Sequence, residues 1–263
     1  TSYTVVNHAV SASLNLKYGQ GMKSLINAVL REFIREKETL LETAKDKGLG
    51  QYSHPKWWID KLREQYPRDY SSILNTGNQR PPMTLRVNQN KIAALDYLTL
   101  LNEHDLNAQI VWDNALILKQ PVSVNSLPEF ATGMVSVQDA GAQLAAPFLD
   151  VHKGMHVLDA CSAPGGKSAH LLELANINLT ALDNNPARLA LVKQNFTRLA
   201  LKKYRIICGD ASNLSTWWNG KLFDRILADV PCSASGVVRR HPDIKWLRRP
   251  NDLIQFASIQ QKI

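Results

Sequence analysis

The second half of the sequence predicts an α/β fold built on an open parallel sheet. Four short apolar runs read as buried strands, and each one ends in, or within two residues of, an aspartate. The runs span 156–159, 179–183, 205–210 and 226–229. Helical patterns at 168–175 and 186–199 separate the first three runs. Strands that alternate with helices are typical of βαβ units and a parallel sheet.

The first half of the chain has two different patterns. From 24 to 44, apolar residues recur at helical spacing with charged residues on the other face, which predicts a packed amphipathic helix. The stretch 78–82, Asn-Gln-Arg-Pro-Pro, then predicts a boundary. Beyond it, strand-like runs at 84–87 and 116–118 flank a helical pattern at 93–103, which indicates a small α+β module.

We therefore expect four parts along the chain. They are a helical segment at 1–48, a helical linker at 49–80, a small α+β module at 81–134 and the α/β domain at 135–263. The chain starts with Thr1, and a helix-like pattern runs to Ile263, so we expect a fragment of a longer protein.

Composition limits the class of protein. The 263 residues include 44% hydrophobic and 21% charged residues, as in an ordinary globular protein. No apolar run approaches the roughly 18 residues of a membrane span, so we expect no membrane partner and a cytoplasmic location. Three cysteines without a CxxC pair argue against a disulfide framework or a zinc site. A net charge of +8 is compatible with a polyanionic partner.

The strand-end aspartates predict a ligand site. In an open parallel sheet the carboxyl ends of the strands share one edge, where ligands bind. Asp159, Asp183, Asp210 and Asp229 would therefore line one rim. One such aspartate is an ordinary turn or cap residue, but four in series in a cationic protein favour a functional role.

The loop after the first strand narrows the ligand class. Residues 160–168 read Ala-Cys-Ser-Ala-Pro-Gly-Gly-Lys-Ser, and the glycines let a backbone approach a ligand closely. Gly166-Lys167-Ser168 matches the end of a phosphate-binding P-loop, but that motif needs glycine where Cys161 stands. The loop also lacks the GxGxxG pattern of dinucleotide sites.

A nucleoside cofactor without a pyrophosphate fits these features better, and S-adenosylmethionine is the common one. Asp183 ends the second strand, where nucleotide-binding sheets hold ribose hydroxyls. Asp210 is expected to meet the adenine edge, and a sulfonium cation suits a site lined by carboxylates.

The three cysteines are expected to differ in role. Cys232, in the turn Asp229-Val230-Pro231-Cys232, is a candidate nucleophile or acid/base at the cofactor rim. Cys208 lies inside a predicted strand and is expected to be an inert core residue. Cys161 is expected to contact the cofactor through its backbone.

These motifs together resemble the NOL1/NOP2/Sun family of RNA cytosine-5 methyltransferases. The resemblance rests on the loop 159–167, on Asp183, on Gly209-Asp210 and on Asp229-Val230-Pro231-Cys232-Ser233, and weaker likeness extends over nearly the whole chain. It implies a class I (Rossmann-like) methyltransferase sheet, a NusB-like helical remnant at 1–48 and an RNA-binding role for 81–134. It also implies 16S ribosomal RNA as substrate. No obligate protein partner is evident.

The resemblance also assigns residues. It implies that S-adenosylmethionine is bound by one set of side chains and backbone groups, with Cys232 assisting product release. That set is Cys161, Ser162, Ala163, Pro164, Gly165, Gly166, Lys167, Asp183, Asp210 and Asp229. The nucleophile of the family lies in a later Thr-Cys pair, which this sequence does not contain.

The segment 236–249 is a candidate for RNA contact because it is basic and closely follows the loop 229–233, which carries Cys232. A charge run is usually a solvated face, but here it is expected to hold phosphates and stack a base. The expected RNA-binding residues are Arg239, Arg240, His241, Lys245 and Trp246.

Two other readings remain open. In one, Cys232 is itself the nucleophile, as in DNA cytosine-5 methyltransferases. In the other, the chain is a non-catalytic RNA-binding protein that uses its helical and α+β parts.

Overall fold

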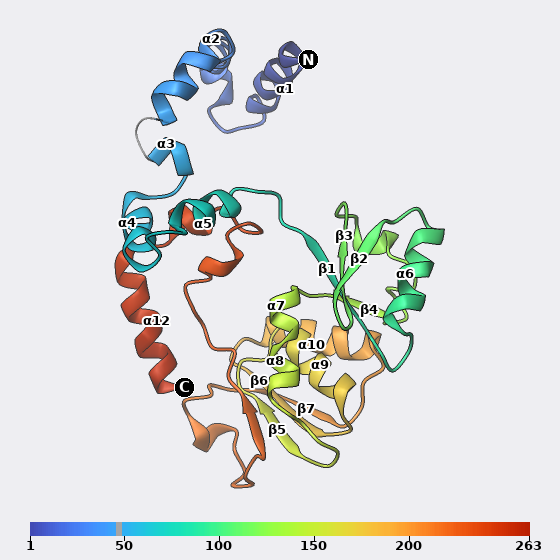
Figure 1. The fold of residues 1–263 in the computed structure, drawn as a ribbon. Helices are drawn as coiled ribbons and strands as arrows, with labels where there is room; N and C mark the ends of the chain where they lie inside the picture. The colour runs from blue at the N-terminus through green and yellow to red at the C-terminus, as the bar shows by residue number, and fades with distance from the viewer. Residues whose placement is uncertain (46–48) are drawn as a thin grey trace. The chain divides into compact units, whose positions relative to one another are not determined.

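The computed structural model describes residues 1–45 and 49–263, and the chain forms two compact units. Unit 1 contains Thr1–Arg80 and Ala234–Pro250, and unit 2 contains Pro81–Ser233 and Asn251–Ile263 (Figure 1). The division at Arg80 lies within the Pro-rich break at 78–82. The expected boundary at residue 48 lies outside the described residues.

Unit 1 is helical. The long helix α2 covers the predicted 24–44 segment, and α1 packs against it. Thr1 caps α1 by accepting a hydrogen bond from the Thr4 backbone N–H. The helices are α1 (Ser2–Ser13), α2 (Gly19–Lys45), α3 (Leu49–Tyr52), α4 (Lys56–Gln65), α5 (Tyr70–Gly77) and α11 (Ile244–Leu247), with a 3-10 turn η3 (Ser235–Val237).

A small apolar core ties the two sequence segments of unit 1 together. Val238 packs with Trp58 and Leu74 in this core. The structure therefore differs from the expected continuous domain at 135–263, because 234–250 leaves it and joins the helices. Periodicity in the sequence does not reveal such a crossing, since the apolar side chains of a segment suit either core.

Unit 2 begins with an antiparallel sheet in the order β2-β3-β1-β4. Its strands are β1 (Met83–Val87), β2 (Ala108–Trp112), β3 (Ala115–Leu118) and β4 (Val135–Val137). Helix α6 (Ala94–Glu103) packs on it through the buried Tyr97 and Leu101. The expected domain start at residue 135 differs from this arrangement, because β4 pairs with β1 in the smaller sheet.

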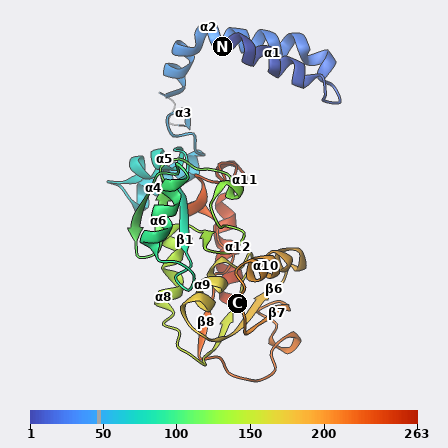
Figure 2. The same ribbon diagram turned by 90° about the vertical axis from the view of Figure 1, so that its right-hand side faces the viewer.

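The second sheet of unit 2 is the predicted parallel one, with the order β7-β6-β5-β8. Its strands are β5 (His156–Asp159), β6 (Asn178–Asp183), β7 (Tyr204–Cys208) and β8 (Arg225–Leu227). Helices α9 (Gly166–Leu174) and α10 (Pro186–Arg198) cover one face through Leu171, Val192 and Phe196 (Figure 2). The order, with β5 in the interior and strands added on both sides, is that of an open doubly wound sheet.

Four short elements and one long helix complete unit 2. They are η1 (Val124–Ser126), α7 (Ala140–Gln143), α8 (Ala145–Phe148), η2 (Leu214–Thr216) and the C-terminal helix α12 (Pro250–Lys262). Helix α7 contacts β1 and β3 of the small sheet and α9 of the larger one. None of the helices in the described ranges combines the length and apolarity that a bilayer crossing requires.

A buried ion pair joins strand β1 of the small sheet to helix α9, which packs on the parallel sheet. Arg86 on β1 donates from Nη2 to Oε1 of Glu173 at 2.8 Å and from Nε to Oε2 at 3.0 Å, and the two side chains are 1% and 5% exposed. Its Nη1 donates to the Gly166 carbonyl at 2.9 Å, and also contacts Gln138. Because both carboxylate oxygens and three guanidinium nitrogens are used, the desolvated charges are matched.

Replacing Glu173 with Gln leaves the Arg86 guanidinium buried beside a neutral group. We expect a loss of about 3–5 kcal/mol in the free energy of unfolding, measured by urea denaturation. The control is Asp150→Asn, which removes the exposed contacts of Asp150 with Arg225 at 3.6 Å and with His152 at 3.2 Å; an exposed pair contributes at most about 1 kcal/mol. Equal losses in the two variants would contradict a structural role for the buried pair.

Candidate cofactor site

The carboxyl ends of the four parallel strands bring the predicted acidic residues to one edge of the sheet. Asp159 and Asp183 are the last residues of β5 and β6. Asp210 and Asp229 each follow the end of β7 and β8 by two residues. The register pairs Asp159 with Leu227 of β8 and Asp183 with Cys208 of β7, whereas Asp159 pairs with Ala181 of β6, so β6 and β7 extend two residues further than β5 at the same edge.

The loop at 160–165 bends back over this edge and leads into α9. Ser162 donates its backbone N–H to the Leu182 carbonyl at 2.8 Å, and Gly165 donates to the Ser162 carbonyl at 2.7 Å. Gly165 has φ +96°, and a Cβ built there would lie 3.2 Å from Val192 Cα. Only glycine suits both the backbone conformation and the close approach of α10.

Asp183 fixes the shape of that loop. Its Oδ2 accepts the Ala163 backbone N–H at 3.2 Å, and its Oδ1 accepts the Asn185 N–H at 3.0 Å. Arg188 Nη1 lies 3.6 Å from Oδ2, and Arg188 Nη2 donates to the Ala163 carbonyl at 2.6 Å. The side chain of Asp183 is 3% exposed. Each carboxylate oxygen keeps lone-pair capacity for a further donor.

Asp159 is the deepest acid of the row. Ser168 Oγ donates to its Oδ2 at 2.5 Å, while its buried Oδ1 has no hydrogen-bond partner among the described residues. Burial raises the pKa of Asp159 to about 6, and hydrogen bonds from Ser168 and from the Cys161 backbone act in the opposite direction. The site therefore holds a desolvated carboxyl with one unused acceptor atom.

The other two acids are exposed. Asp229 contacts Lys167 Nζ in an ion pair across the mouth of the loop. Asp210 accepts the Ser212 N–H at 2.9 Å and the Ser212 hydroxyl at 2.8 Å, and these hydrogen bonds lower the pKa of Asp210. The row thus has two buried carboxyls and two that face solvent.

The cysteines differ from one another, as expected, but not all in the expected way. Cys161 is half-buried, and burial followed by the charges of Asp159, Asp183 and Asp229 raises the pKa of its thiol to about 11. Its thiol is therefore neutral near pH 7. Cys208 was expected in the core but is exposed, because it is the last residue of β7, which lies at the edge of the sheet. Cys232 is exposed on the loop after β8.

The remaining loop residues span a range of exposure. Ser162, Ala163 and Gly165 are buried, Pro164 is exposed, and Gly166 and Lys167 are half-buried. Ser162 Oγ is a second buried atom without a described hydrogen-bond partner. The residues predicted from the sequence to bind a cofactor therefore lie together at one edge of the parallel sheet in unit 2.

The expected RNA-binding residues lie in unit 1, whereas the loop with Cys232 lies in unit 2. Arg239 Nη2 donates to the Arg80 carbonyl at 2.7 Å, and His241 and Trp246 are exposed. Lys245 differs from the expectation, because it is 5% exposed and its Nζ donates to Asn78 Oδ1 at 2.7 Å. Burial lowers the pKa of Lys245. We therefore regard Lys245 as a structural residue of unit 1.

Sequence reasoning missed Arg86, Ser168 and Arg188. Ser168 was noted only as the end of an imperfect P-loop match, and Arg86 only as part of a strand. An arginine inside a short apolar strand is unusual because charged residues are rarely buried without a partner. The position of Arg86 in an apolar strand could therefore have indicated a buried charged partner. No group of His, Cys, Asp and Glu side chains within 1–45 and 49–263 is arranged to hold a metal ion.

Two family models match the chain. Residues 146–263 match the model described as 16S rRNA methyltransferase RsmB/F, and residues 54–125 match a ferredoxin-like domain described as RsmF/B-like. Ribosomal RNA small subunit methyltransferase B of Vibrio cholerae is 43% identical over 267 residues, covering 100% of this chain and 61% of that protein. The probable counterpart of Coxiella burnetii is 45% identical over 261 residues, covering 97% and 60%.

A solved structure, that of NSun6 from Pyrococcus horikoshii with SFG, has a TM-score of 0.70 at 17% identity and covers 79% of this chain and 78% of that one. This likeness concerns the fold. The chain spans about three fifths of the length of the two curated relatives described above.

The buried acid gives a pH-dependent stability. The pKa of Asp159 is raised above its unfolded value, so the folded state binds the proton more tightly and stability falls as pH rises from about 4 to about 6. Asp159→Asn removes this loss. We expect the free energy of unfolding of the variant, relative to that of the unsubstituted chain, to rise by on the order of 3 kcal/mol from about pH 4 to about pH 7. Urea denaturation at both pH values measures this difference. A difference that stays constant with pH would contradict the assignment.

Proposed function

Because the chain belongs to the RsmB/F family of 16S rRNA methyltransferases, we propose that it carries the S-adenosylmethionine site of an enzyme that methylates C5 of a cytosine in 16S ribosomal RNA. The observation that supports the proposal most is the row of carboxyls beside the glycine bend at one strand edge. An rRNA substrate is also consistent with a cytoplasmic location and with the net charge of +8.

The residues at this edge fit the cofactor chemically. Asp159 Oδ1 and Ser162 Oγ are buried acceptors without described hydrogen-bond partners. In the proposal Asp183 accepts ribose hydroxyls, Asp210 meets the adenine edge, and the acidic surroundings stabilise a sulfonium cation. The loop 161–167 and Asp229 are the other residues that we propose bind the cofactor. SFG, which accompanies the structural neighbour, is an analogue of S-adenosylmethionine.

The cofactor supplies the methyl group, and the chain must hold the base and move protons. In the proposed reaction a cysteine thiolate adds to C6 of the cytosine, which makes C5 nucleophilic. After C5 is methylated, a base removes the C5 proton, and the C6–S bond breaks to release product and thiolate. Cys161 is unsuited to the attack, because a pKa of about 11 keeps its thiol protonated near neutral pH.

Cys232 is the exposed cysteine of the reactive loop, and we assign it to the release step, with the attacking cysteine in a Thr-Cys pair elsewhere in the longer protein. The alternative, with Cys232 as the nucleophile, makes an opposite prediction about the covalent adduct. The RNA contacts proposed in unit 1 are Arg239, Arg240, His241 and Trp246. The target cytosine must leave its stack to be attacked, which favours a looped or single-stranded RNA.

Cofactor binding tests the first part of the proposal. Calorimetric titration of this chain with S-adenosylmethionine is expected to give binding heat, and Asp210→Asn is expected to weaken the affinity about ten-fold, because a charged hydrogen-bond acceptor is lost. The control is Asp105→Asn, which changes an exposed carboxylate in the turn between α6 and β2. Absence of any binding heat, together with retained RNA binding, would favour the non-catalytic RNA-binding alternative.

The role of Cys232 is tested in the longer protein. With Cys232→Ala and 16S ribosomal RNA, we expect a covalent protein–RNA complex to accumulate on denaturing gels, because addition to C6 proceeds while release is slowed. Unmodified RNA without a complex would instead identify Cys232 as the nucleophile. The matched control is Cys208→Ala, which removes an exposed cysteine at the end of β7.

A further inference from the structure

A second binding site lies on the parallel sheet, away from the acidic edge. Its cavity of about 330 Å³ is lined by residues at the starts of three strands, His156 of β5, Asn178 of β6 and Tyr204 of β7, and by the segment 217–223. The acidic residues of the cofactor site stand at the other ends of the same strands. The cavity is therefore separate from the cofactor site.

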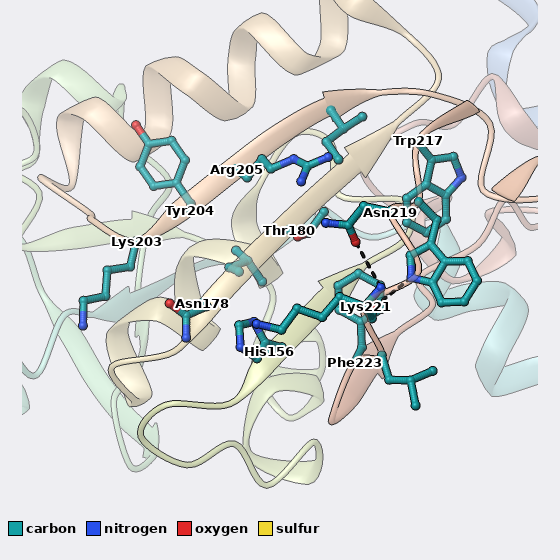
Figure 3. Close-up of a pocket in the computed structure, with 14 residues that line it drawn as sticks. His156, Asn178, Thr180, Lys203, Tyr204, Arg205, Trp217, Asn219, Lys221 and Phe223 are labelled. Carbon is teal, nitrogen blue, oxygen red and sulfur yellow. Dashed lines mark hydrogen bonds between the residues drawn. The ribbon is translucent and has the colours of Figure 1, made fainter. Parts of the chain in front are cut away.

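The lining is cationic and aromatic. His156, Lys203, Arg205 and Lys221 line the cavity with Trp217, Trp218 and Phe223, and no aspartate or glutamate is among the lining residues (Figure 3). The Asp224 carboxylate lies just beside it and is engaged by the His156 backbone N–H at 2.7 Å. In the described part of the chain, no ion pair is recorded for Arg205 or Lys221, and both are exposed.

Hydrogen bonds and ring packing hold the aromatic side chains that line the cavity. Trp218 Nε1 donates to the Lys221 carbonyl at 2.8 Å, and Lys221 N–H in turn donates to Asn219 Oδ1 at 3.1 Å, as the dashed lines of Figure 3 show. Trp217 Nε1 donates to the Asp210 carbonyl at 3.0 Å, and its ring stands 6.4 Å from that of Phe223. Trp218 is half-buried, so part of its indole remains open to a ligand.

The cavity lies on the face of the parallel sheet that helices α9 and α10 do not cover. Thr180 and Arg205 are paired neighbours on β6 and β7, and they lie on the face opposite the helices, since the alternate residues Leu179, Ala181 and Ile206 pack in the core with α10. The connection from β7 to β8 contains one regular element, the short 3-10 turn η2, and no long helix that would cover this face.

We propose that this cavity, the cationic–aromatic pocket, binds a single-stranded segment of the RNA substrate at a distance from the reacting base. The inference rests on the proposed function for the identity of the polyanion. Arg205 and Lys221 would neutralise backbone phosphates, and the Trp218 indole would stack a base. Absence of acidic lining residues favours a polyanion over a cationic or neutral ligand.

The test compares two charge-matched double variants of this chain. R205Q/K221Q removes two cations from the pocket, and K153Q/K193Q removes two exposed cations that do not line it. Affinity for a short fluorescein-labelled single-stranded oligoribonucleotide is measured by anisotropy at several salt concentrations. We expect R205Q/K221Q to bind at least about ten-fold more weakly and to lower the salt slope by about 0.7 per lost phosphate contact. K153Q/K193Q is expected to change little.

Base stacking gives an independent arm. Trp218→Ala is expected to weaken binding about ten-fold, and Trp218→Phe to retain most of it, because any aromatic face can stack a base. Cross-linking of 4-thiouridine-labelled RNA to the unsubstituted chain should label peptides within 203–223. Equal affinities and salt slopes for the two double variants, or cross-links confined to other regions, would overturn the proposal. Titration with S-adenosylmethionine is run on every variant, so failure of the pocket is distinguished from failure of the cofactor site.

Discussion

The Arg86 guanidinium is the contact on which the arrangement of unit 2 depends. It leaves a strand of the small antiparallel sheet, pairs with Glu173 on α9 and donates to the carbonyl of Gly166, the first residue of that helix. Gly166 belongs to the loop assigned to the cofactor. A residue of the smaller module therefore helps to position the start of α9, and a change there is transmitted to the loop through one side chain.

Burial divides the acidic row into two kinds of group. Asp183 already uses both oxygens to hold the loop and α10, so its carboxylate is positioned before any ligand arrives. Asp159 is desolvated and retains one unused oxygen, which makes it the more costly group to bury and the more responsive one to an added donor or cation. Asp210 and Asp229 are exposed, and solvent competes for their contacts.

Local sequence patterns were informative wherever local chemistry decides the structure. The strand ends and helices α2, α6, α9 and α10 follow from short-range periodicity, and in the structure the Asn185 side chain also caps the start of α10. The open parallel sheet, and with it the class I methyltransferase fold, was confirmed.

Features that depend on long-range pairing were not predictable in this way. The strand at 135–137 has a pattern that suits either sheet, and only its partner β1 decides between them. Lys245 looks like any other cation of a basic run until Asn78, 167 positions earlier, is seen beside it. The roles of Arg86 and Arg188 likewise require partners distant in the sequence.

The polypeptide passes between the two units three times, after Arg80, after Ser233 and after Pro250. Neither unit is a continuous stretch, so no single cut in the gene yields one of them intact, and a protease nick at 233–234 would leave pieces that stay associated only through packing. The second passage lies one residue beyond Cys232. The loop that carries Cys232 is therefore also the segment that connects unit 2 to the 234–250 part of unit 1, so a change in the length of that loop alters both.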